Sequence, residues 1–298
     1  MNKTRITISL LFLITVQGIV GCSTWHETLL VEQSEEPEGV LWFDDYFTLQ
    51  YIDEMTIAIG EPRYYQQNYS YLILGKDRAI LLDTGPGLRD IRAVVESLTK
   101  LPVTAVSSHL HYDHIGNHDR FDKVALIDLP SIRKSVSSGV FSPSFSEHLG
   151  FLEGIEKPSF SVTEWWSPQQ EIDLGERVLT VIQAPGHTPE SIVLLDNQRD
   201  LLFSGDFIYE GQLLAFLPGA NLNQYYESAQ KLLELTSEKT RLLGAHRWKP
   251  SSGAPVMRYK DLADLTKSLG NILSSELKGD GVILKNYPIN NRMEIIVH

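Results

Sequence analysis

The sequence contains one cysteine, Cys22, among its 298 residues and no cluster of lysine or arginine. With a single thiol, no disulfide can form within the chain, even in an oxidising compartment. The formal net charge is −12, and an acidic surface without a local basic groove repels a phosphate backbone. We therefore expect no nucleic acid among its partners and look for a small-molecule substrate instead.

The N-terminal apolar run, Ile6 to Val16, is too short for a convincing membrane-spanning helix. It follows Lys3 and Arg5, which is the layout of a signal peptide. The run then leads into Ile19-Val20-Gly21-Cys22, which resembles a bacterial lipobox. We predict a lipoprotein signal peptide over residues 1–21 and lipidation of Cys22. The alternative is a plain signal peptide in which Cys22 is incidental.

These features predict an exported bacterial lipoprotein whose N-terminal lipid is its only contact with a membrane. Ser23 replaces the aspartate that is linked to inner-membrane retention, so resemblance to sorting rules favours the outer membrane, facing the periplasm. Removal of residues 1–21 takes away two basic residues and leaves a mature net charge of −14. Residues 22–39 are acidic and polar, which is typical of a flexible tether.

Residues 40–298 are expected to form the folded part of the chain. The whole chain is 42% hydrophobic and 21% charged, which is ordinary for a globular protein, and no internal repeat of fixed period is found. Apolar patterns that alternate between strand and helix spacing predict an α/β fold. The predicted strands are 69–74, 79–82, 103–106, 124–127, 177–183, 191–195, 201–203, 282–285 and 293–297, and the predicted helices are 89–100, 222–235 and 259–277.

The stretch from Ser131 to Pro168 breaks this pattern with serine, glycine, proline and several aromatic residues. Long irregular stretches inside compact domains are usually functional or mobile. We interpret this one either as a lid over an apolar substrate pocket or as a surface excursion anchored by its aromatic side chains.

Four side chains of metal-ligating type fall within six residues, His109-Leu110-His111-Tyr112-Asp113-His114. This segment follows the predicted strand 103–106. Alternation would place His109, His111 and Asp113 on one side of an extended segment, with His114 beginning the next turn. Imidazole and carboxylate ligands suit zinc or a similar first-row metal, and these four exceed what one open catalytic site needs. Two metal ions are therefore expected.

The motif HxHxDH after a buried strand resembles the signature of the metallo-β-lactamase fold superfamily. Three further ligands follow in the family's order, each after an apolar run: His187 in Pro-Gly-His-Thr, Asp206 in Ser-Gly-Asp, and His246 in Gly-Ala-His. The resemblance covers roughly residues 41–277. It implies a four-layer αββα sandwich with the metal site at the sheet edge.

The resemblance also implies how the ligands are shared. His109, His111 and His187 would hold one metal, and Asp113, His114 and His246 the second. Asp206 and a hydroxide would bridge both ions, which would be two Zn²⁺, with iron or manganese as alternatives. Taken singly, each ligand has a structural explanation, such as a turn or a helix cap; the ordered set of seven is what favours a metal site.

Two more side chains are assigned roles near this site. Asp83, in Asp-Thr-Gly after a predicted strand, would orient a metal ligand from behind, or it is simply a turn-forming aspartate. Tyr209 would donate a hydrogen bond to a developing oxyanion, or it serves packing. The remaining histidines, His26, His118, His148 and His298, are expected to be ordinary surface or core residues.

A metal pair of this kind ionises water, and the hydroxide attacks an electron-poor carbonyl carbon, with Asp113 fixing it and passing the proton onward. In true β-lactamases of the superfamily the position of Asp206 is not the bridging aspartate. The resemblance therefore favours a dinuclear zinc hydrolase that cleaves a thioester, lactone or related ester. Residues 211–219 loosely resemble acyl-thioesterases and would wall an acyl pocket or belong to the core.

Other interpretations of the sequence remain open. An iron-dependent oxidoreductase of the same fold, similar to persulfide dioxygenases, would use the same ligand positions. A β-lactam hydrolase and a non-catalytic ligand-binding lipoprotein are further alternatives. Arg247 and Lys249, just after His246, would meet an anionic substrate group or, as we prefer, are solvated cations. The oligomeric state is not predicted.

Overall fold

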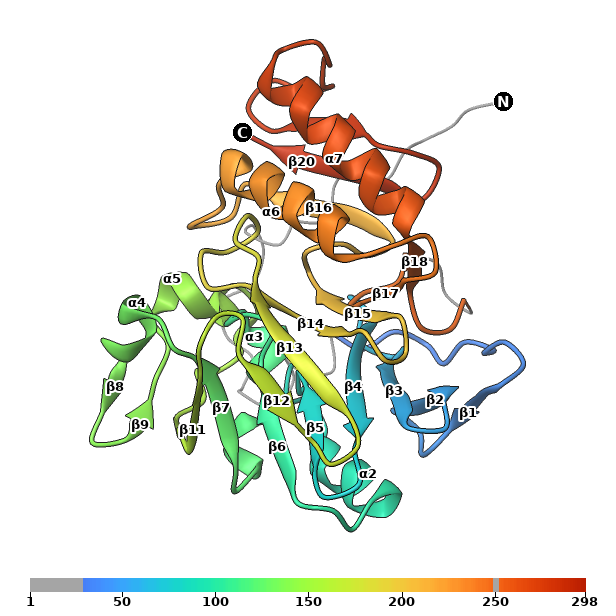
Figure 1. Cartoon of the computed structure of the whole chain (residues 1–298), viewed down its shortest axis with the longest axis vertical. Helices are drawn as coiled ribbons and strands as arrows, with labels where there is room; N and C mark the ends of the chain where they lie inside the picture. Colours follow the sequence, from blue (N-terminus) through green and yellow to red (C-terminus); the bar gives the residue numbers. More distant parts are fainter. Residues whose placement is uncertain (1–28, 249–251) are drawn as a thin grey trace, which may run out of the picture.

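The computed structural model describes residues 29–248 and 252–298, and two large β-sheets face each other in it (Figure 1). The predicted signal peptide, Cys22, His26 and Lys249 lie outside the described residues. Within the described residues, no helix is both long enough and apolar enough to cross a bilayer.

The first sheet, counted over the described residues, has eight strands. β1 to β5 form an antiparallel meander, and the remaining strands join in parallel. In spatial order the strands are β1 (Val40–Trp42), β2 (Thr48–Asp53), β3 (Thr56–Glu61), β4 (Asn68–Leu74), β5 (Ala79–Leu82), β6 (Val103–Val106), β7 (Val124–Ile127) and β11 (Glu164–Trp166). β1 to β3 were not predicted from the sequence.

The second sheet is antiparallel except where β15 and β17 run in parallel. Its described strands, in spatial order, are β12 (Glu171–Asp173), β13 (Val178–Gln183), β14 (Ile192–Asp196), β15 (Leu201–Gly205), β17 (Arg241–Gly244) and β18 (Val256–Arg258). The described residues also form two small three-stranded sheets. They consist of β10 (Phe160–Ser161), β9 (Val140–Phe141) and β8 (Val136–Ser137), and of β16 (Gly211–Ala215), β20 (Met293–Val297) and β19 (Lys285–Pro288).

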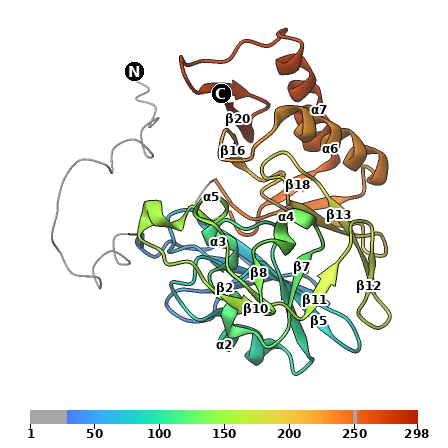
Figure 2. The same ribbon diagram turned by 90° about the vertical axis from the view of Figure 1, so that its left-hand side faces the viewer.

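Helices cover the outer faces of both sheets, as Figures 1 and 2 show. α2 packs on the first sheet, and α6 and α7 pack side by side on the second. Three short helices, α3, α4 and α5, lie in the connections. Their bounds are α2 (Ile91–Leu98), α3 (Tyr112–Ile115), α4 (Pro130–Arg133), α5 (Phe145–His148), α6 (Leu222–Leu235) and α7 (Tyr259–Leu273).

Strand alternation explains why the sheets stack. In β5, Ile80 and Leu82 point into the core between the sheets, whereas Ala79 and Leu81 pack beneath α2. In β14, Ile192 and Leu194 face the same inner core, whereas Val193 and Leu195 face α6 and α7. Each sheet therefore buries both faces, and the predicted four-layer αββα sandwich is confirmed.

A buried arginine links the two sheets at the end away from the predicted ligands. Arg177 donates to Asp196 Oδ2 across 2.8 Å, and both side chains are almost fully buried. Its Nη1 donates to the carbonyl oxygens of Met55 and Leu74, on the side of the first sheet, at 2.6 and 2.9 Å. A buried guanidinium needs all of these partners, so the pair fixes how the sheets align at this end.

The segment predicted as a tether differs from the prediction where it is described. Leu30 forms an antiparallel bridge with Tyr64, and Leu29 and Leu30 pack against the core under the first sheet. The Glu36 side chain is only 2% exposed because it pairs with Arg247. Composition alone suggested flexibility, but these few apolar and charged contacts hold residues 29–36 on the folded part of the chain.

The irregular stretch 131–168 contains more structure than its sequence pattern predicted. It contributes α4, α5, the small sheet β10-β9-β8 and strand β11. Phe141 and Phe160 are buried and stack at 5.3 Å between ring centroids, whereas Phe145 and Phe151 are 63% and 55% exposed. Part of the stretch is therefore anchored in the core, and its exposed aromatic residues gather on α5 and the turn Gly150–Glu153.

Candidate metal centre

The seven predicted ligands all follow strands of the two sheets. His109, His111, Asp113 and His114 come after β6, His187 after β13, Asp206 after β15 and His246 after β17. β6 belongs to the first sheet, and the other three strands belong to the second. Because the carboxyl ends of these strands meet at one edge of the sandwich, residues separated by well over a hundred positions are brought together.

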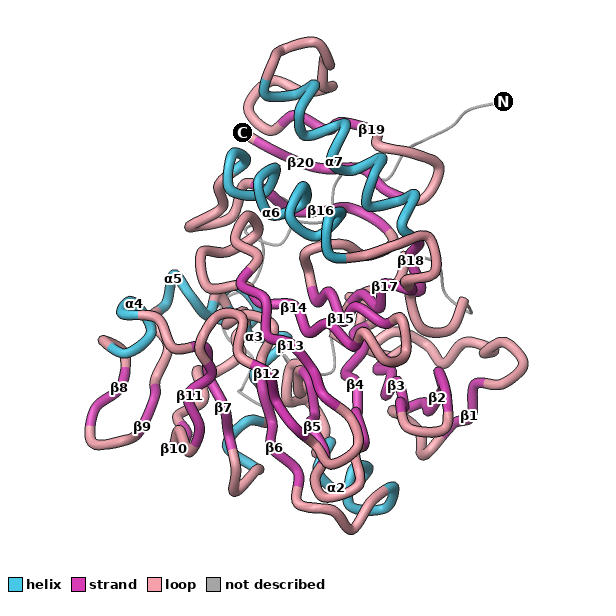
Figure 3. Tube along the Cα trace, in the orientation of Figure 1, coloured by secondary structure: helices cyan, strands magenta, loops and turns pink. Residues whose placement is uncertain are grey.

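The local conformation of the HxHxDH segment differs from the prediction. The backbone is extended only as far as His111, and Asp113 and His114 lie on the helical turn α3 that follows. Figure 3 shows α3 as a short helix among the loops next to the first sheet. The turn is closed by a hydrogen bond from His114 N to His111 O, at 3.0 Å. The helical turn, rather than strand alternation, separates the four side chains into two groups.

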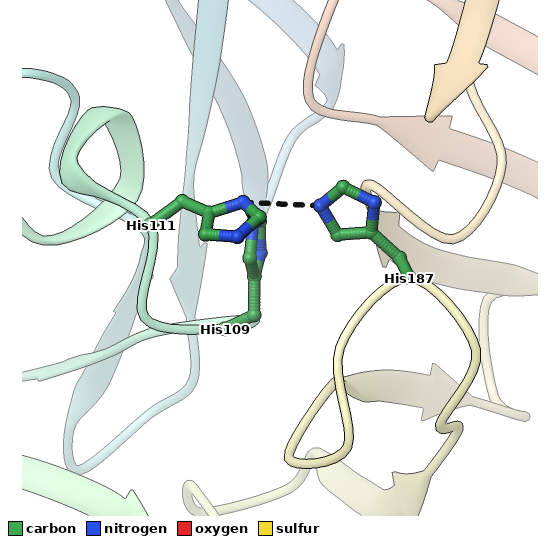
Figure 4. Close-up of side chains that lie close together, drawn as sticks. All are labelled: His109, His111 and His187. Atoms are coloured by element: carbon green, nitrogen blue, oxygen red, sulfur yellow. Dashed lines mark hydrogen bonds between the residues drawn. The ribbon is translucent and has the colours of Figure 1, made fainter. Parts of the chain in front are cut away.

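Three histidines form the first group. His109 Nε2 lies 2.9 Å from His111 Nδ1, which lies 3.1 Å from His187 Nε2. Figure 4 shows His109 and His111 approaching from one loop and His187 from the opposite loop, with their rings converging. Ligands of a tetrahedral zinc, each about 2.0–2.1 Å from the metal, lie about 3.4 Å apart, so these separations suit one metal ion.

The second group consists of Asp113, His114 and His246. Asp113 Oδ2 lies 3.4 Å from the Nε2 atoms of both histidines. The ligand atoms of the three residues all lie within 4.8 Å of one another, and all three side chains are buried. One carboxylate and two imidazoles again match the ligand set of a first-row metal.

Asp206 lies between the two groups. Its Oδ1 is 3.1 Å from His246 Nε2 and 3.4 Å from His114 Nε2, both in the second group. Its Oδ2 is 3.6 Å from His187 Nε2, in the first group. One oxygen therefore faces each group, which is the arrangement of a carboxylate that bridges two cations.

The protonation states of these residues also fit a metal site. Burial, with the neighbouring histidines, lowers the pKa of His109 and brings the pKa of His111 to about 3, so both rings are neutral at pH 7. For Asp206, burial raises the pKa, but His246 and His114 outweigh it and the net pKa is lowered. A metal ion needs neutral imidazoles and ionised carboxylates as ligands.

Unsatisfied atoms mark the same place. His114 Nε2 and Asp206 Oδ1 are buried and make no hydrogen bond within the described residues. A buried polar atom without a partner costs free energy, and a bound cation would satisfy both atoms at once. The pKa of His114 is raised, because Asp113, Asp83 and Asp206 outweigh its burial. This local excess of negative charge is what a cation would neutralise.

The outer nitrogens of three ligands are held by acceptors. Asp83 Oδ2 contacts His114 Nδ1 at 2.9 Å, and Leu214 O accepts from His187 Nδ1 at 2.7 Å. Gln66 O accepts from His246 Nδ1 at 3.1 Å. With Nδ1 protonated, the Nε2 lone pair of each ring points toward the centre. Asp83 thus lies behind His114, in contact with the outer nitrogen of that ring.

Asp83 is itself fixed by the loop before the ligands. Its Oδ1 accepts from Ser108 N at 2.6 Å, and its Oδ2 accepts from Ser108 Oγ at 2.9 Å. Its backbone has φ +61°, a left-handed conformation that is uncommon for a residue other than glycine. Such conformations cluster at functional sites, where surrounding contacts maintain them.

The sequence did not point to Gln66, on the loop between β3 and β4, or to Asn68, the first residue of β4. Asn68 Nδ2 donates to Asp113 Oδ2 at 3.2 Å and to Asp113 O at 2.8 Å, so it orients the carboxylate. Gln66 acts through its backbone oxygen, which any residue type supplies. Neither has a local sequence signal, because both act on ligands far away in the chain.

The proposed oxyanion role of Tyr209 is not supported by its position. The Tyr209 hydroxyl is buried and donates to Gln212 O, so it is already committed to the backbone. Its ring packs edge-on against His246 at 5.1 Å between centroids. The side chain fills the space behind a ligand instead of presenting a donor to the substrate.

The preferred interpretation of Arg247 as a solvated cation is wrong. Arg247 is 4% exposed, and its guanidinium donates to both carboxylate oxygens of Glu36 at 2.6 and 2.7 Å. An arginine whose side chain is fully buried must be paired, and here the partner comes from the N-terminal segment. It is not available for an anionic substrate.

A cavity of about 170 Å³ lies beside His111. Its walls include Ser131, Ile132, Ser146 and Glu147 from the irregular stretch, together with Thr188 and Glu190 from the His187 loop. The stretch 131–168 therefore lines the space next to the first metal group. A larger hollow of about 450 Å³ lies between α6 and α7 and includes none of the predicted ligands.

The hydrophobic residues of 211–219 divide between two environments. Leu213, on β16, is fully buried in the cluster shared with α6 and α7, so it belongs to the core. Leu214 is half-buried and contributes the backbone oxygen that holds His187. The cavity beside His111 is lined instead by Pro218 and Gly219 from this run.

Comparison with known proteins shows which family the chain resembles. The family model described as the metallo-beta-lactamase superfamily matches residues 63–246, which span all seven ligands. The human protein named acyl-coenzyme A thioesterase MBLAC2 is 29% identical over 192 residues, covering 55% of this chain and 67% of that protein.

Two further similarities are weaker. The hydroxyacylglutathione hydrolase of Francisella tularensis subsp. novicida is 26% identical over 174 residues, covering 58% of this chain and 60% of that protein. A solved metallo-beta-lactamase from Pontibacter korlensis superposes with a TM-score of 0.58 at 17% identity, over 76% of this chain and 99% of that one. At that identity the superposition shows the fold alone.

Proposed function

Since the chain belongs to the metallo-beta-lactamase superfamily and is a metal-dependent hydrolase, we propose that it hydrolyses thioesters with a pair of zinc ions. His109, His111 and His187 would hold one ion, and Asp113, His114 and His246 the other. Asp206 would bridge them. Lactones and related esters are the closest alternative substrates, since they present the same electrophilic carbonyl carbon.

The position of Asp206 is the observation that carries this proposal. Its two oxygens face different ligand groups, at 3.1 Å from His246 Nε2 and 3.6 Å from His187 Nε2. A bridging carboxylate at this position is the feature that separates the thioesterase, lactonase and glyoxalase-type branch from the true β-lactamases. The two relatives named above as thioesterase and hydroxyacylglutathione hydrolase support the same choice.

The metal pair, when bound, would supply Lewis acidity and make water acidic enough to act as a nucleophile at neutral pH. Asp113 Oδ2 then serves as the proton acceptor for the attacking water, and Asn68 holds that carboxylate at 3.2 Å. The proton passes from Asp113 to the departing thiolate. The balanced products are a carboxylic acid and a thiol from one thioester and one water.

The cavity beside His111 is the proposed place for the part of the substrate next to the scissile bond. Glu147 and Glu190 both lie in its wall. An anionic group would be disfavoured there by these two carboxyl groups. We therefore expect an uncharged acyl or thiol portion in this cavity, with any phosphate-bearing portion outside it.

The proposal is tested with purified, zinc-loaded protein and a substrate panel. The panel contains a short neutral acyl thioester, an acyl-coenzyme A, a lactone, a phosphodiester and a β-lactam. We expect the neutral thioester to be cleaved with the highest kcat/KM, and the His111→Ala variant to be inactive. The proposal is contradicted if the metal-loaded protein cleaves none of the thioesters. It is also contradicted if the protein binds a single iron and consumes oxygen when a persulfide is supplied.

We also propose that the chain is an exported lipoprotein anchored through Cys22, with its folded part in the periplasm at the outer membrane. This rests on the sequence alone. Cys22 and Leu29, the first described residue, are seven positions apart, and a chain of that length reaches at most about 25 Å. The mass of the mature N-terminus is the test, and an unmodified residue 22, or an uncleaved segment 1–21, contradicts the proposal.

A further inference from the structure

The N-terminal segment, residues 29–36, pairs with the loop that holds one of the metal ligands. Val31 N donates to Arg63 O at 2.7 Å, and Tyr65 N donates to Leu29 O at 3.2 Å. Leu30 and Tyr64 form the antiparallel bridge between them. Residues 29–31 therefore add a short strand-like edge to residues 63–65, between β3 and β4.

Glu36, at the end of this segment, forms a fully buried ion pair. Its carboxylate accepts two hydrogen bonds from Arg247, at 2.6 and 2.7 Å, and the two side chains are 2% and 0% exposed. Arg247 Nε also donates to Gln67 Oε1 at 2.6 Å, and its guanidinium lies 5.8 Å from the ring centre of Tyr69. A charge buried this deeply is stable only with its partner, so the pair ties residue 36 to residue 247.

The metal ligand His246 directly precedes Arg247 in the chain. Its Nδ1 donates to Gln66 O at 3.1 Å, and it forms a β-bridge with Asn68. Tyr69 N donates to Ala245 O at 2.7 Å, on the other side of the histidine. Residues 66–69 and the backbone at 245–247 are thus bound to each other, and Glu36 is connected to both through Arg247 and Gln67.

The contacts that hold the first metal group do not come from the N-terminal segment. His187 Nδ1 is held by Leu214 O, and His109 Nδ1 contacts Ser108 Oγ at 3.1 Å, an oxygen that also lies 3.5 Å from His114 Nδ1 of the second group. None of the supporting atoms belongs to residues 29–36 or to residues 63–69. A change at Glu36 should therefore disturb the second group, which contains His246, much more than the first.

We propose that Glu36 is a positioning residue for the second metal group, acting through Arg247 and Gln67 on His246. This rests on the proposed two-metal site, and it adds that the N-terminal segment is part of the metal centre's support. Loss of the Glu36 charge leaves Arg247 buried without its partner. The guanidinium must then move toward water and takes the backbone of His246 with it.

Zinc titration of the metal-free full chain by calorimetry tests this, with the wild type compared with Glu36→Gln. The wild type should bind two zinc ions. In the variant we expect the affinity for the first ion to stay within about twofold and the affinity for the second to fall by about 10–100-fold, as for other residues that support a ligand. The His246→Ala variant lacks a ligand of the second group only, so its titration shows how zinc binding changes when that group alone is lost.

Asp196→Asn is the matched control, because it also breaks a fully buried arginine–carboxylate pair, but at the far end of the sandwich. It should lower Tm and leave both zinc affinities unchanged. Two zinc affinities in Glu36→Gln equal to those of the wild type, or both weakened alike, would overturn the inference. If Glu36→Gln does not fold, Arg247→Lys, which keeps the charge but loses the paired hydrogen bonds, is titrated in its place with the same expectation. A wild type that binds fewer than two zinc ions would instead refute the proposed function.

Discussion

Asp206 places one carboxylate oxygen toward each of the two metal groups. Its replacement by alanine removes the carboxylate that faces His246 on one side and His187 on the other. We expect Asp206→Ala to retain at most one metal ion per chain and to lose at least about 100-fold in kcat/KM. Elemental analysis and thioesterase assays on the same sample measure both effects. Two retained metals with unchanged activity would contradict the bridging role.

Substitution of Tyr209, unlike that of Asp206, is expected to leave activity nearly unchanged. Because its hydroxyl donates to Gln212 O, Tyr209→Phe should leave kcat within about twofold of the wild type and cost about 1 kcal/mol of stability, as for one lost hydrogen bond. Steady-state kinetics and urea unfolding are the measurements. A loss of about 100-fold in kcat, as seen when an oxyanion donor is removed, would show that the hydroxyl reaches the substrate after all.

Strand β15, which ends directly before Asp206, passes close to Ser108 at Gly205. This glycine has φ +50°, and a Cβ there would lie 2.5 Å from the Cβ of Ser108, which supports Asp83 and His109. Gly205→Ala should therefore cost about 1–2 kcal/mol for the backbone conformation and weaken zinc binding as well. Gly139→Ala is the control, since Gly139 has φ +81° with nothing within 4 Å of its Cβ position. It should show a similar backbone cost and normal zinc binding; equal zinc affinities in the two variants would rule out the packing argument.

Elements whose signals are local could be predicted from the sequence. α6 occupies the predicted residues 222–235, because Asn221 caps its first turn and its apolar face is regular. The hairpin of β4 and β5 was found for the same reason. The last predicted strand but one was misplaced, since Val282 and Ile283 are 93% and 78% exposed and β19 begins at Lys285. Apolar residues alone do not make a strand without a neighbour to pair with.

For the candidate site, too, the residues with a local sequence signal could be predicted and the others could not. Its ligands could be named because each follows a buried strand within a short, recognisable motif. Glu36, Gln66 and Asn68 could not, because their contacts join parts of the chain that are 45 to 211 positions apart. Such residues carry no signal until the two sheets are brought together.

At the scale of the whole molecule, buried carboxyl groups make stability depend on pH. Burial raises the pKa of Glu61 to about 8, although its hydrogen bond from Tyr46 acts in the other direction. The folded state thus binds a proton that the unfolded chain, with a pKa near 4.5, has released. This contribution to stability is fully present below about pH 4.5 and is lost as pH rises through about 8, at up to about 1.4 kcal/mol per pH unit.

Glu61→Gln cannot ionise, so its free energy of unfolding should lack this decline. Urea unfolding of both proteins between pH 5 and 8 is the measurement, and the difference between them cancels the pH dependence that both share. We expect the variant to gain stability relative to the wild type as pH rises. A constant difference across this range would mean that Glu61 is already ionised in the folded state.

Seven side chains from both sheets are proposed to hold two metal ions. Elemental analysis of the purified full chain, calibrated against protein concentration, measures how many ions it holds. We expect two zinc ions per chain in the wild type and at most one in Asp206→Ala. A wild type that carries a single iron, or no transition metal after incubation with zinc, would contradict the proposed two-metal site.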